Sequence, residues 1–180
     1  MTLLPIAYLC LGSNLGDREE NLCRALALLS AEADLEDVSS VYETEPVPTL
    51  YRGKKQPFFL NMVCRIATGL PPEELLRLAK DIEAKMDRAP GGPVNSPRPI
   101  DIDILFYDDL TMETQTLTIP HPRMKERAFV LIPLAEIAPN LVHPICGKSV
   151  ARLANDVQGQ NGVRKYRGGF DVPTIRGRPL

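Results

Sequence analysis

Apolar and polar residues alternate between residues 100 and 107. Three isoleucines and Phe106 occupy every second position, and Asp101 and Asp103 stand between them. This period-two pattern is typical of a β-strand with one face in a core. Asp is depleted in strands, so two Asp residues on the same strand face indicate a special role.

The pattern predicts further elements on both sides of this strand. An apolar opening strand ends at the turn residues 12–14, and Asp17 offers an N-cap for a helix. Strands are expected at about 37–44 and 58–67, and a second helix begins at Pro71-Pro72. The two helices have apolar stripes at helical spacing, formed by Leu22, Ala25, Leu26 and Leu29 in the first and by Leu75, Ala79, Ile82 and Met86 in the second.

The order strand, helix, strand, strand, helix, strand is that of the split βαβ arrangement. We therefore expect an α+β fold with a ferredoxin-like core, in which helices pack on an antiparallel sheet as a three-layer α-β-α structure. Residues 1–150 are expected to form a single domain. The composition turns rich in Gly, Arg and Asn beyond about residue 150, which predicts an extended or partly disordered C-terminal extension over 151–180.

Composition narrows the function classes. The 180 residues are 44% apolar, and 21 Lys and Arg against 23 Asp and Glu give a net charge of −2. Bulk charge therefore predicts neither nucleic-acid nor membrane binding, and any anion site must be local. The start is apolar but short and lacks a basic leader, so we interpret it as a buried strand. Four scattered cysteines without C-x-x-C spacing favour a reduced, cytoplasmic protein.

The two acids suggest a metal site. Residues i and i+2 of a strand lie about 7 Å apart and project side by side, so their charges repel by roughly 2 kcal/mol at an effective dielectric constant of about 20. A shared divalent cation would turn this repulsion into binding, and magnesium prefers such oxygen ligands. The alternative is a solvent-facing strand whose acids have no function.

Cations flank the acids on both sides. Arg98 precedes them, and His121, Lys125 and Arg127 follow, all of them able to bind phosphate oxygens. An acid pair combined with a cation cluster indicates a metal-nucleotide site.

Five segments together resemble the 6-hydroxymethyl-7,8-dihydropterin pyrophosphokinase family of the folate pathway. They occur in the family's order and cover most of residues 5–150: AYLCLGSNLGD (7–17), VSSVYETEPV (38–47), QPFFLNMV (56–63), PRPIDIDIL (97–105) and IPHPRMKERAFVLIPLAEIAPNLVHP (119–144). The resemblance implies an enzyme, a transferase and kinase that moves a pyrophosphoryl group from MgATP to the hydroxymethyl group of the pterin, giving AMP and the pterin diphosphate.

The resemblance also implies roles for individual residues. Asp101 and Asp103 would hold two Mg²⁺ ions, and Arg88 and Arg98 would join them in catalysis by neutralising the transferring group. The positions that would contact ATP are Glu83, Arg98, Ile104, Thr118, His121 and Arg127. Phe59 and Phe129 would sandwich the pterin ring and Asn61 would read its edge, while the backbone of Thr44, Glu45, Pro46 and Val47 would close the pocket.

The loop at residues 87–97 departs from the family's pattern. Many relatives carry several arginines and a tryptophan there, whereas this chain has no Trp and places Asn95 at the Trp position. We expect altered lid closure with the same chemistry.

Two alternatives come from other classes: a binding module that kept the pocket and lost turnover, and an RNA-binding module on the same sheet. The first does not need the acids and arginines, and the second lacks exposed aromatic residues on its central strands. We expect ATP and the pterin as small-molecule substrates, no nucleic-acid or membrane partner, and a monomer or weak dimer.

Overall fold

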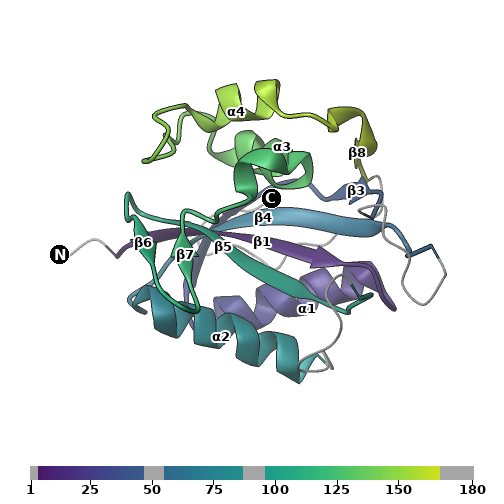
Figure 1. Cartoon of the computed structure of the whole chain (residues 1–180). Helices are drawn as coiled ribbons and strands as arrows, with labels where there is room; N and C mark the ends of the chain where they lie inside the picture. The colour runs from purple at the N-terminus through teal and green to yellow at the C-terminus, as the bar shows by residue number, and fades with distance from the viewer. Residues whose placement is uncertain (1–3, 47–54, 87–95, 167–180) are drawn as a thin grey trace.

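An antiparallel six-stranded sheet forms the centre of the structure, a computed structural model that describes residues 4–46, 55–86 and 96–166 (Figure 1). Neighbouring strands follow the order β5-β1-β4-β3-β8, and β2 pairs with β4 beside β3. The strands are β1 (Ile6–Ser13), β2 (Asp34–Val38), β3 (Tyr42–Thr44), β4 (Phe59–Ala67), β5 (Asp101–Tyr107) and β8 (Val163–Lys165).

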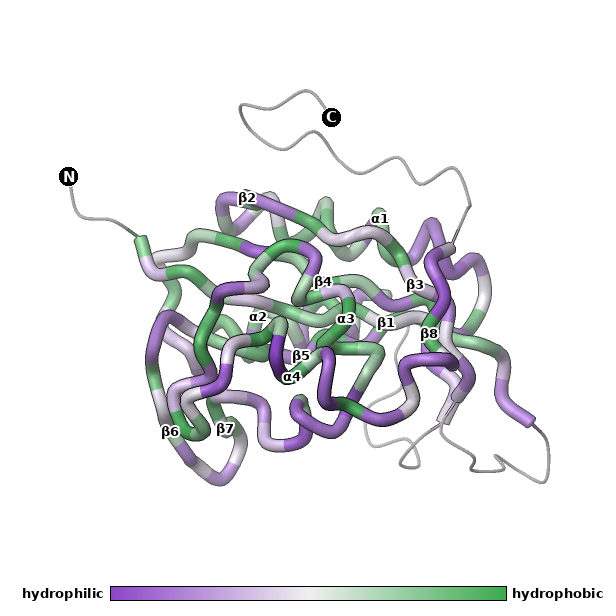
Figure 2. Tube along the Cα trace, turned by 90° about the horizontal axis from the view of Figure 1, so that it is seen from above, coloured by the Kyte–Doolittle hydropathy of each residue, from purple (hydrophilic) through white to green (hydrophobic). Residues whose placement is uncertain are grey.

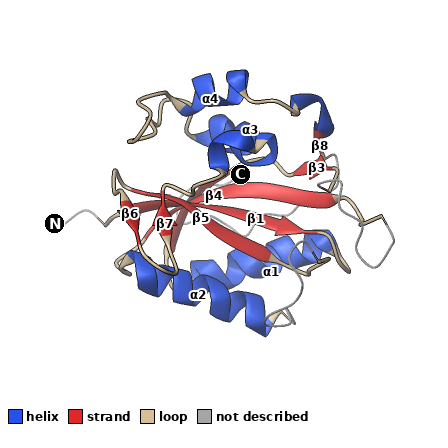
Figure 3. Cartoon of the chain, viewed as in Figure 1, coloured by secondary structure: helices blue, strands red, loops and turns tan. Residues whose placement is uncertain are grey.

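Helices cover both faces of this sheet (Figure 3). On one face lie α1 (Arg18–Ser30) and α2 (Pro72–Lys85), and on the other lie α3 (Ala128–Ile137) and α4 (Val150–Asp156). Short elements complete the described part: the β6 (Met112–Glu113) and β7 (Thr118–Ile119) ribbon, and the 3-10 turns η1 (Met124–Glu126) and η2 (Gln160–Gly162). The predicted α+β, ferredoxin-like core in three layers is confirmed.

Two hydrophobic cores lie on the two faces of the sheet. The predicted stripes of α1 and α2 are buried against β1, β4 and β5 in the first core. In the second core α3, whose residues are mostly apolar, packs on β4 and α4. Figure 2 shows the hydrophobic colours in the middle of the molecule, where α3 lies over the sheet, and hydrophilic colours around β8 at its edge. Burial of apolar surface on both faces therefore fixes the sheet between its helices.

The alternation along β5 reverses near its end. The isoleucines at 100, 102 and 104 face the α1 and α2 core as predicted, but Leu105 and Phe106 both belong to the α3 and α4 core. The register with β1 shifts at this point, since Tyr8 pairs with Phe106 and Leu9 with Ile104, leaving Leu105 as a bulge. The extra residue moves Phe106 to the face opposite the one that strict alternation predicts.

The strand expected at 37–44 is divided into β2 and β3. Ser39 lies at the break, where its backbone N–H donates to the Val63 carbonyl at 2.8 Å. Its hydroxyl accepts from the Val63 N–H at 2.9 Å. Because a side-chain oxygen replaces the usual backbone acceptor, the chain can bend here without leaving Val63 unsatisfied.

The segment after residue 150 is ordered as far as the structure describes it. Residues 151–166 contain most of α4, then η2 and β8, where the sequence analysis expected an extended or partly disordered extension. β8 pairs with β3, and the Tyr166 hydroxyl donates to a Glu19 carboxylate oxygen at 2.7 Å. β8 has too few alternating apolar side chains to be predicted as a strand from its sequence. It is a strand because it pairs with β3.

Two cysteines, Cys10 of β1 and Cys64 of β4, are buried and behave as apolar side chains. Burial raises the pKa of the Cys10 thiol well above its usual value, with Asp103 adding to the effect, and it raises the pKa of Cys64 to about 12. Both thiols are therefore protonated at neutral pH. In the part of the chain that the structure describes, no helix has the length and apolarity needed to cross a bilayer.

Glu136 of α3 joins three parts of the fold. Its carboxylate accepts hydrogen bonds from the Ser40 N–H (3.0 Å), the Ser40 hydroxyl (2.6 Å) and the Tyr42 hydroxyl (2.9 Å). Lys165 of β8 lies 3.6 Å away. Burial opposes ionisation of Glu136, but the bonds from Ser40 and Tyr42 outweigh it, so its pKa is lower than usual. The same contact raises the pKa of Tyr42 to about 12, with burial the larger cause.

We predict that Glu136→Gln destabilises the protein at pH 7 by about 1 kcal/mol, because an amide cannot accept all of these bonds. A depressed folded-state pKa contributes stability above the unfolded value, near 4.5, that is lost as the pH falls through the folded value. The wild type should therefore lose more stability than the variant between pH 5 and 3, measured by urea unfolding. Substitution of the exposed Glu32 by Gln is the control, and parallel acid losses in wild type and Glu136→Gln would contradict the prediction.

Candidate active site

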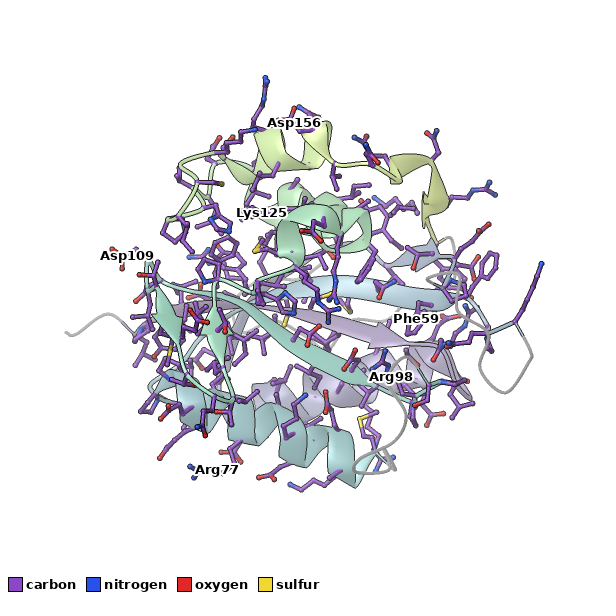
Figure 4. All side chains as sticks on the ribbon, viewed as in Figure 1. Phe59, Arg77, Arg98, Asp109, Lys125 and Asp156 are labelled. Atoms are coloured by element: carbon purple, nitrogen blue, oxygen red, sulfur yellow. The ribbon has the colours of Figure 1, made fainter. Side chains whose placement is uncertain are left out.

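The predicted site residues gather at one end of the sheet, on the face that carries α3. In the register across β1, Gly12 stands opposite Asn61 of β4 on one side and opposite Asp101 of β5 on the other. Two residues earlier in β1, Cys10 stands opposite Asp103 of β5. Figure 4 shows Phe59 and Arg98 beside each other at this end. Residues from β4, β1 and β5 thus lie side by side, although they are 40 or more positions apart in the sequence.

The two acids of β5 each face a cation. The Asp101 carboxylate lies 3.3 Å from Nη1 of Arg98, and the Asp103 carboxylate lies 3.6 Å from Nη1 of Arg127. Asp103 is one-third exposed and the other three side chains are one-fifth to one-quarter exposed. These distances are those of ion pairs rather than of short hydrogen bonds, so an anionic ligand can draw the guanidinium groups away from the acids.

His121 completes this cluster. Its Nδ1 accepts from the Arg123 N–H at 3.2 Å, and its Nε2 lies 3.8 Å from the Asp103 carboxylate. Burial lowers the pKa of His121 below its usual value, while Asp103 opposes the shift in part. The imidazole is therefore neutral at pH 7, with its proton on Nε2. His121 accordingly directs an N–H toward the acids without adding charge.

The bulge in β5 brings His121 to the site. The carbonyl of the bulged Leu105 accepts a hydrogen bond from the His121 N–H at 3.0 Å. β-bulges commonly redirect a neighbouring side chain beside an active site. This bond ties the segment after β7 to the end of the acid-bearing strand.

Gly12 is buried in β1, directly beside Asn61 of β4. A Cβ atom added there would stand 2.8 Å from Oδ1 of Asn61, closer than real Cβ contacts allow. Asn61 is 3% exposed, and its Nδ2 donates to the Thr44 hydroxyl at 2.8 Å. The absence of a side chain at Gly12 therefore lets Asn61 keep this position, between Thr44 and the acids.

Two aromatic rings lie next to the cluster of acids and arginines, and each has an arginine above it. The Arg98 guanidinium lies 5.9 Å from the centroid of the Phe59 ring, and the Arg127 guanidinium lies 5.6 Å from that of Phe129. These are cation–π distances. Each arginine thus contacts one acid and one aromatic ring, which links the cation cluster to the apolar part of the site.

Some predicted residues lie elsewhere. The Ile104 side chain is buried in the α1 and α2 core, on the face opposite the acids. Glu83 is also buried, and its carboxylate accepts from the Ile102 N–H at 2.8 Å and from Lys80. In the structure the Ile104 side chain packs in a core and the Glu83 carboxylate bonds to the backbone of β5. Their contacts with ATP stay predictions.

The remaining predicted residues are placed as follows. Thr118 lies in β7, next to the turn that carries His121, and Glu45 and Pro46 follow β3 directly after Thr44. Arg88 and Val47 lie outside the described residues, as does the loop over 87–95. Their predicted roles stay predictions.

The sequence analysis missed two residues of the site. It interpreted Gly12 and Asn14 as a turn cluster, but Gly12 belongs to β1 and Asn14 is 1% exposed. An Asn that follows an apolar strand predicts a turn, and the sequence does not show whether that Asn is buried. Only its contacts with residues 56, 57 and 98 distinguish it from an ordinary turn residue.

The donor set fits magnesium bound together with a phosphate ligand. Within residues 4–46, 55–86 and 96–166, no group of three or more His, Cys, Asp or Glu side chains could enclose a metal ion. Magnesium is commonly held by one or two carboxylates plus substrate phosphates and waters, which matches a pair of acids. In addition, the buried Nε of Arg98 has no hydrogen-bond partner among the described residues, so this donor remains for a ligand.

Comparison with known proteins identifies relatives. The chain is 44% identical over 171 residues to the 2-amino-4-hydroxy-6-hydroxymethyldihydropteridine pyrophosphokinase of Bacillus subtilis, covering 92% of this chain and 94% of that protein. It is 43% identical over 163 residues to the folic acid synthesis protein fol1 of Schizosaccharomyces pombe, covering 89% of this chain but 21% of fol1. The chain therefore spans about a fifth of the length of that longer relative.

Solved structures agree in fold. Wild-type HPPK-DHPS of Plasmodium falciparum with pteroate superposes with a TM-score of 0.64 at 18% identity, over 84% of this chain and 44% of that one. The sequence model of the 7,8-dihydro-6-hydroxymethylpterin-pyrophosphokinase (HPPK) family matches residues 8–139, which include both acids, Arg98, His121, Arg127 and the two aromatic rings. The chain belongs to the 7,8-dihydro-6-hydroxymethylpterin-pyrophosphokinase family.

Proposed function

We propose that this protein transfers a pyrophosphoryl group from MgATP to the hydroxymethyl group of 6-hydroxymethyl-7,8-dihydropterin, forming AMP and the pterin diphosphate in folate biosynthesis. One observation carries the proposal. The acid pair, with Arg98, Arg127 and His121 around it, lies in register with Gly12 and Asn61, and the two arginines also contact Phe59 and Phe129. This arrangement supports a site in which phosphate-binding groups stand next to groups that suit a flat ring.

Asp101 and Asp103 would hold two Mg²⁺ ions. When bound, magnesium would neutralise phosphate charge and lower the barrier to attack by the pterin hydroxyl. The acids supply the negative charge that attracts the ions, and Arg98 and Arg127 leave their acids to contact phosphate oxygens. Arg88 would add a further positive charge. Such contacts strengthen as charge develops on the transferring group, so they raise kcat more than affinity.

The pterin would lie over Gly12 with its ring between Phe59 and Phe129. Its polar edge would meet the Asn61 amide, which the hydrogen bond to Thr44 holds in one orientation. The backbone of residues 44–47 would close this edge. Aromatic faces with a few directed polar groups suit a flat heterocycle that forms hydrogen bonds.

We also propose the compartment and the oligomeric state in which the protein acts. The two buried, protonated thiols suit a reducing compartment, and we place the protein in the cytoplasm. We propose that it acts as a monomer or weak dimer on these two small molecules.

Product analysis tests the reaction. The full chain is incubated with ATP, magnesium and 6-hydroxymethyl-7,8-dihydropterin, and AMP is separated from ADP by chromatography. AMP formed in equal amount with the pterin diphosphate supports pyrophosphoryl transfer. ADP would indicate an ordinary kinase, and pterin binding without turnover would indicate a binding module.

We predict that Asp101→Asn and Asp103→Asn each lower kcat by about 100-fold or more, because each removes a charge that magnesium needs while keeping the side-chain shape. Magnesium-dependent ATP binding, measured by calorimetry with and without the ion, should weaken as well. The matched control is Asp109→Asn, in the exposed turn after β5. Near-normal kcat in either site variant would exclude its role in metal binding.

We also predict that Gly12→Ala weakens pterin binding by about tenfold, the equivalent of one hydrogen bond, because the new Cβ displaces the Asn61 amide. Affinity for MgATP should change little. Gly69→Ala is the matched control, since its added Cβ would meet only Leu4 at an ordinary 3.7 Å. Equal affinities in the two variants would show that the pterin does not lie over Gly12, and equal losses for both ligands would indicate a folding defect.

A further inference from the structure

Asn14 lies in the turn between β1 and α1 and bonds to two other segments of the chain. Its side chain is an amide that is 1% exposed. A buried amide normally uses both its acceptor and its donor, and Asn14 does so. Its acceptor binds the segment before β5, and its donor binds the segment before β4.

The first of these contacts fixes the backbone of Arg98. The Asn14 Oδ1 accepts from the Arg98 N–H at 2.9 Å, and the Asn14 N–H donates to the Arg98 carbonyl at 3.2 Å. Two bonds to the same residue define both its position and its orientation. Arg98 comes three residues before Asp101, and its guanidinium reaches both Asp101 and the Phe59 ring.

The second contact fixes the approach to β4. The Asn14 Nδ2 donates to the Gln56 side-chain oxygen at 3.2 Å and lies 3.4 Å from the Pro57 carbonyl. Gln56 is itself buried, at 7% exposed. Two residues after Pro57 the chain begins β4 with Phe59. The same amide therefore holds the backbone on either side of the place where Arg98 and Phe59 meet.

We propose that Asn14 is a positioning residue, which sets Arg98 against Asp101 and against the Phe59 ring by bonding both backbones. The proposal rests on the proposed function, because Arg98 is there the group that neutralises the transferring phosphate. Asn14 itself touches neither substrate. Its effect passes through the placement of Arg98, and placement errors of about 1 Å can cost on the order of 100-fold in rate.

The side-chain type explains this role. Leu has nearly the shape of Asn but neither accepts nor donates, so Asn14→Leu leaves the buried Arg98 N–H and Gln56 without this partner. Asp keeps the acceptor for Arg98, but it loses the donation to Gln56 and adds a buried negative charge, which lowers stability. The two variants therefore separate the contact with the Arg98 backbone from the contact with the segment before β4.

The first experiment measures kcat, both KM values and thermal stability for the full chain and its variants. For Asn14→Leu we expect kcat to fall about 10- to 100-fold, with the KM values changing less than about threefold. The matched control is Asn21→Leu. Asn21 supports the same turn by donating to the Ser13 hydroxyl and to the Leu15 carbonyl, rather than by bonding to Arg98 or Gln56. It should lose stability to a similar degree and keep most of its kcat.

Rescue by Asp and a double-mutant cycle complete the test. Asn14→Asp should recover most of kcat although it is no more stable than Asn14→Leu, because the acceptor for Arg98 remains. In an Arg98→Ala background, Asn14→Leu should lower kcat less than about threefold further, since the residue through which it acts is gone.

Three results would overturn the proposal while leaving the proposed function intact: equal kcat losses in the Asn14 and Asn21 variants, kcat that follows stability alone, or effects that multiply with Arg98→Ala. Absence of any AMP formation by the wild type would overturn the proposed function, and this proposal with it.

Discussion

The register of β1 between β4 and β5 is the constraint on which the site depends. Because β1 is flanked on both sides, one choice of pairing places Gly12 between Asn61 and Asp101, and Cys10 next to Asp103. A slip of one residue would turn every side chain of the strand to the other face. The apolar residues of β1 at 7, 9 and 11 are completely buried against α1 and α2, so hydrophobic burial holds this register and with it the site.

Charge compensation determines how the site can hold two acids on one strand. Each acid has a guanidinium group within 3.6 Å, and a neutral His121 adds a donor without adding charge. The repulsion between the acids is thus relieved before any ligand arrives, and the arginines remain near enough to move to phosphate. Their second contacts, with Phe59 and Phe129, join this electrostatic cluster to the aromatic walls. Binding of one substrate can therefore affect the surroundings of the other.

Several polar side chains hold the segments that carry the site. Glu136 joins α3 to the start of β3, Ser39 allows the bend between β2 and β3, and Asn14 joins the turn after β1 to the segments before β4 and β5. Each satisfies backbone groups that regular secondary structure leaves open. The site lies where strands end, so its geometry depends on such side-chain bonds more than the geometry of the sheet centre does.

The sequence alone determined the fold class, the two sheet-covering helices with their buried stripes, the acid pair on one strand face and the family resemblance. These follow from periodicity and from short motifs, which are local properties. It did not determine the bulge at Leu105, the division of the second strand at Ser39, the pairing of β8, or the roles of Gly12 and Asn14. Each of these depends on a partner between 24 and 123 positions away, such as Val63 for Ser39 or Arg98 for Asn14. A turn residue on the surface and one that positions a site look alike in sequence, and only the tertiary structure, by burying one of them against distant backbone groups, decides between the two.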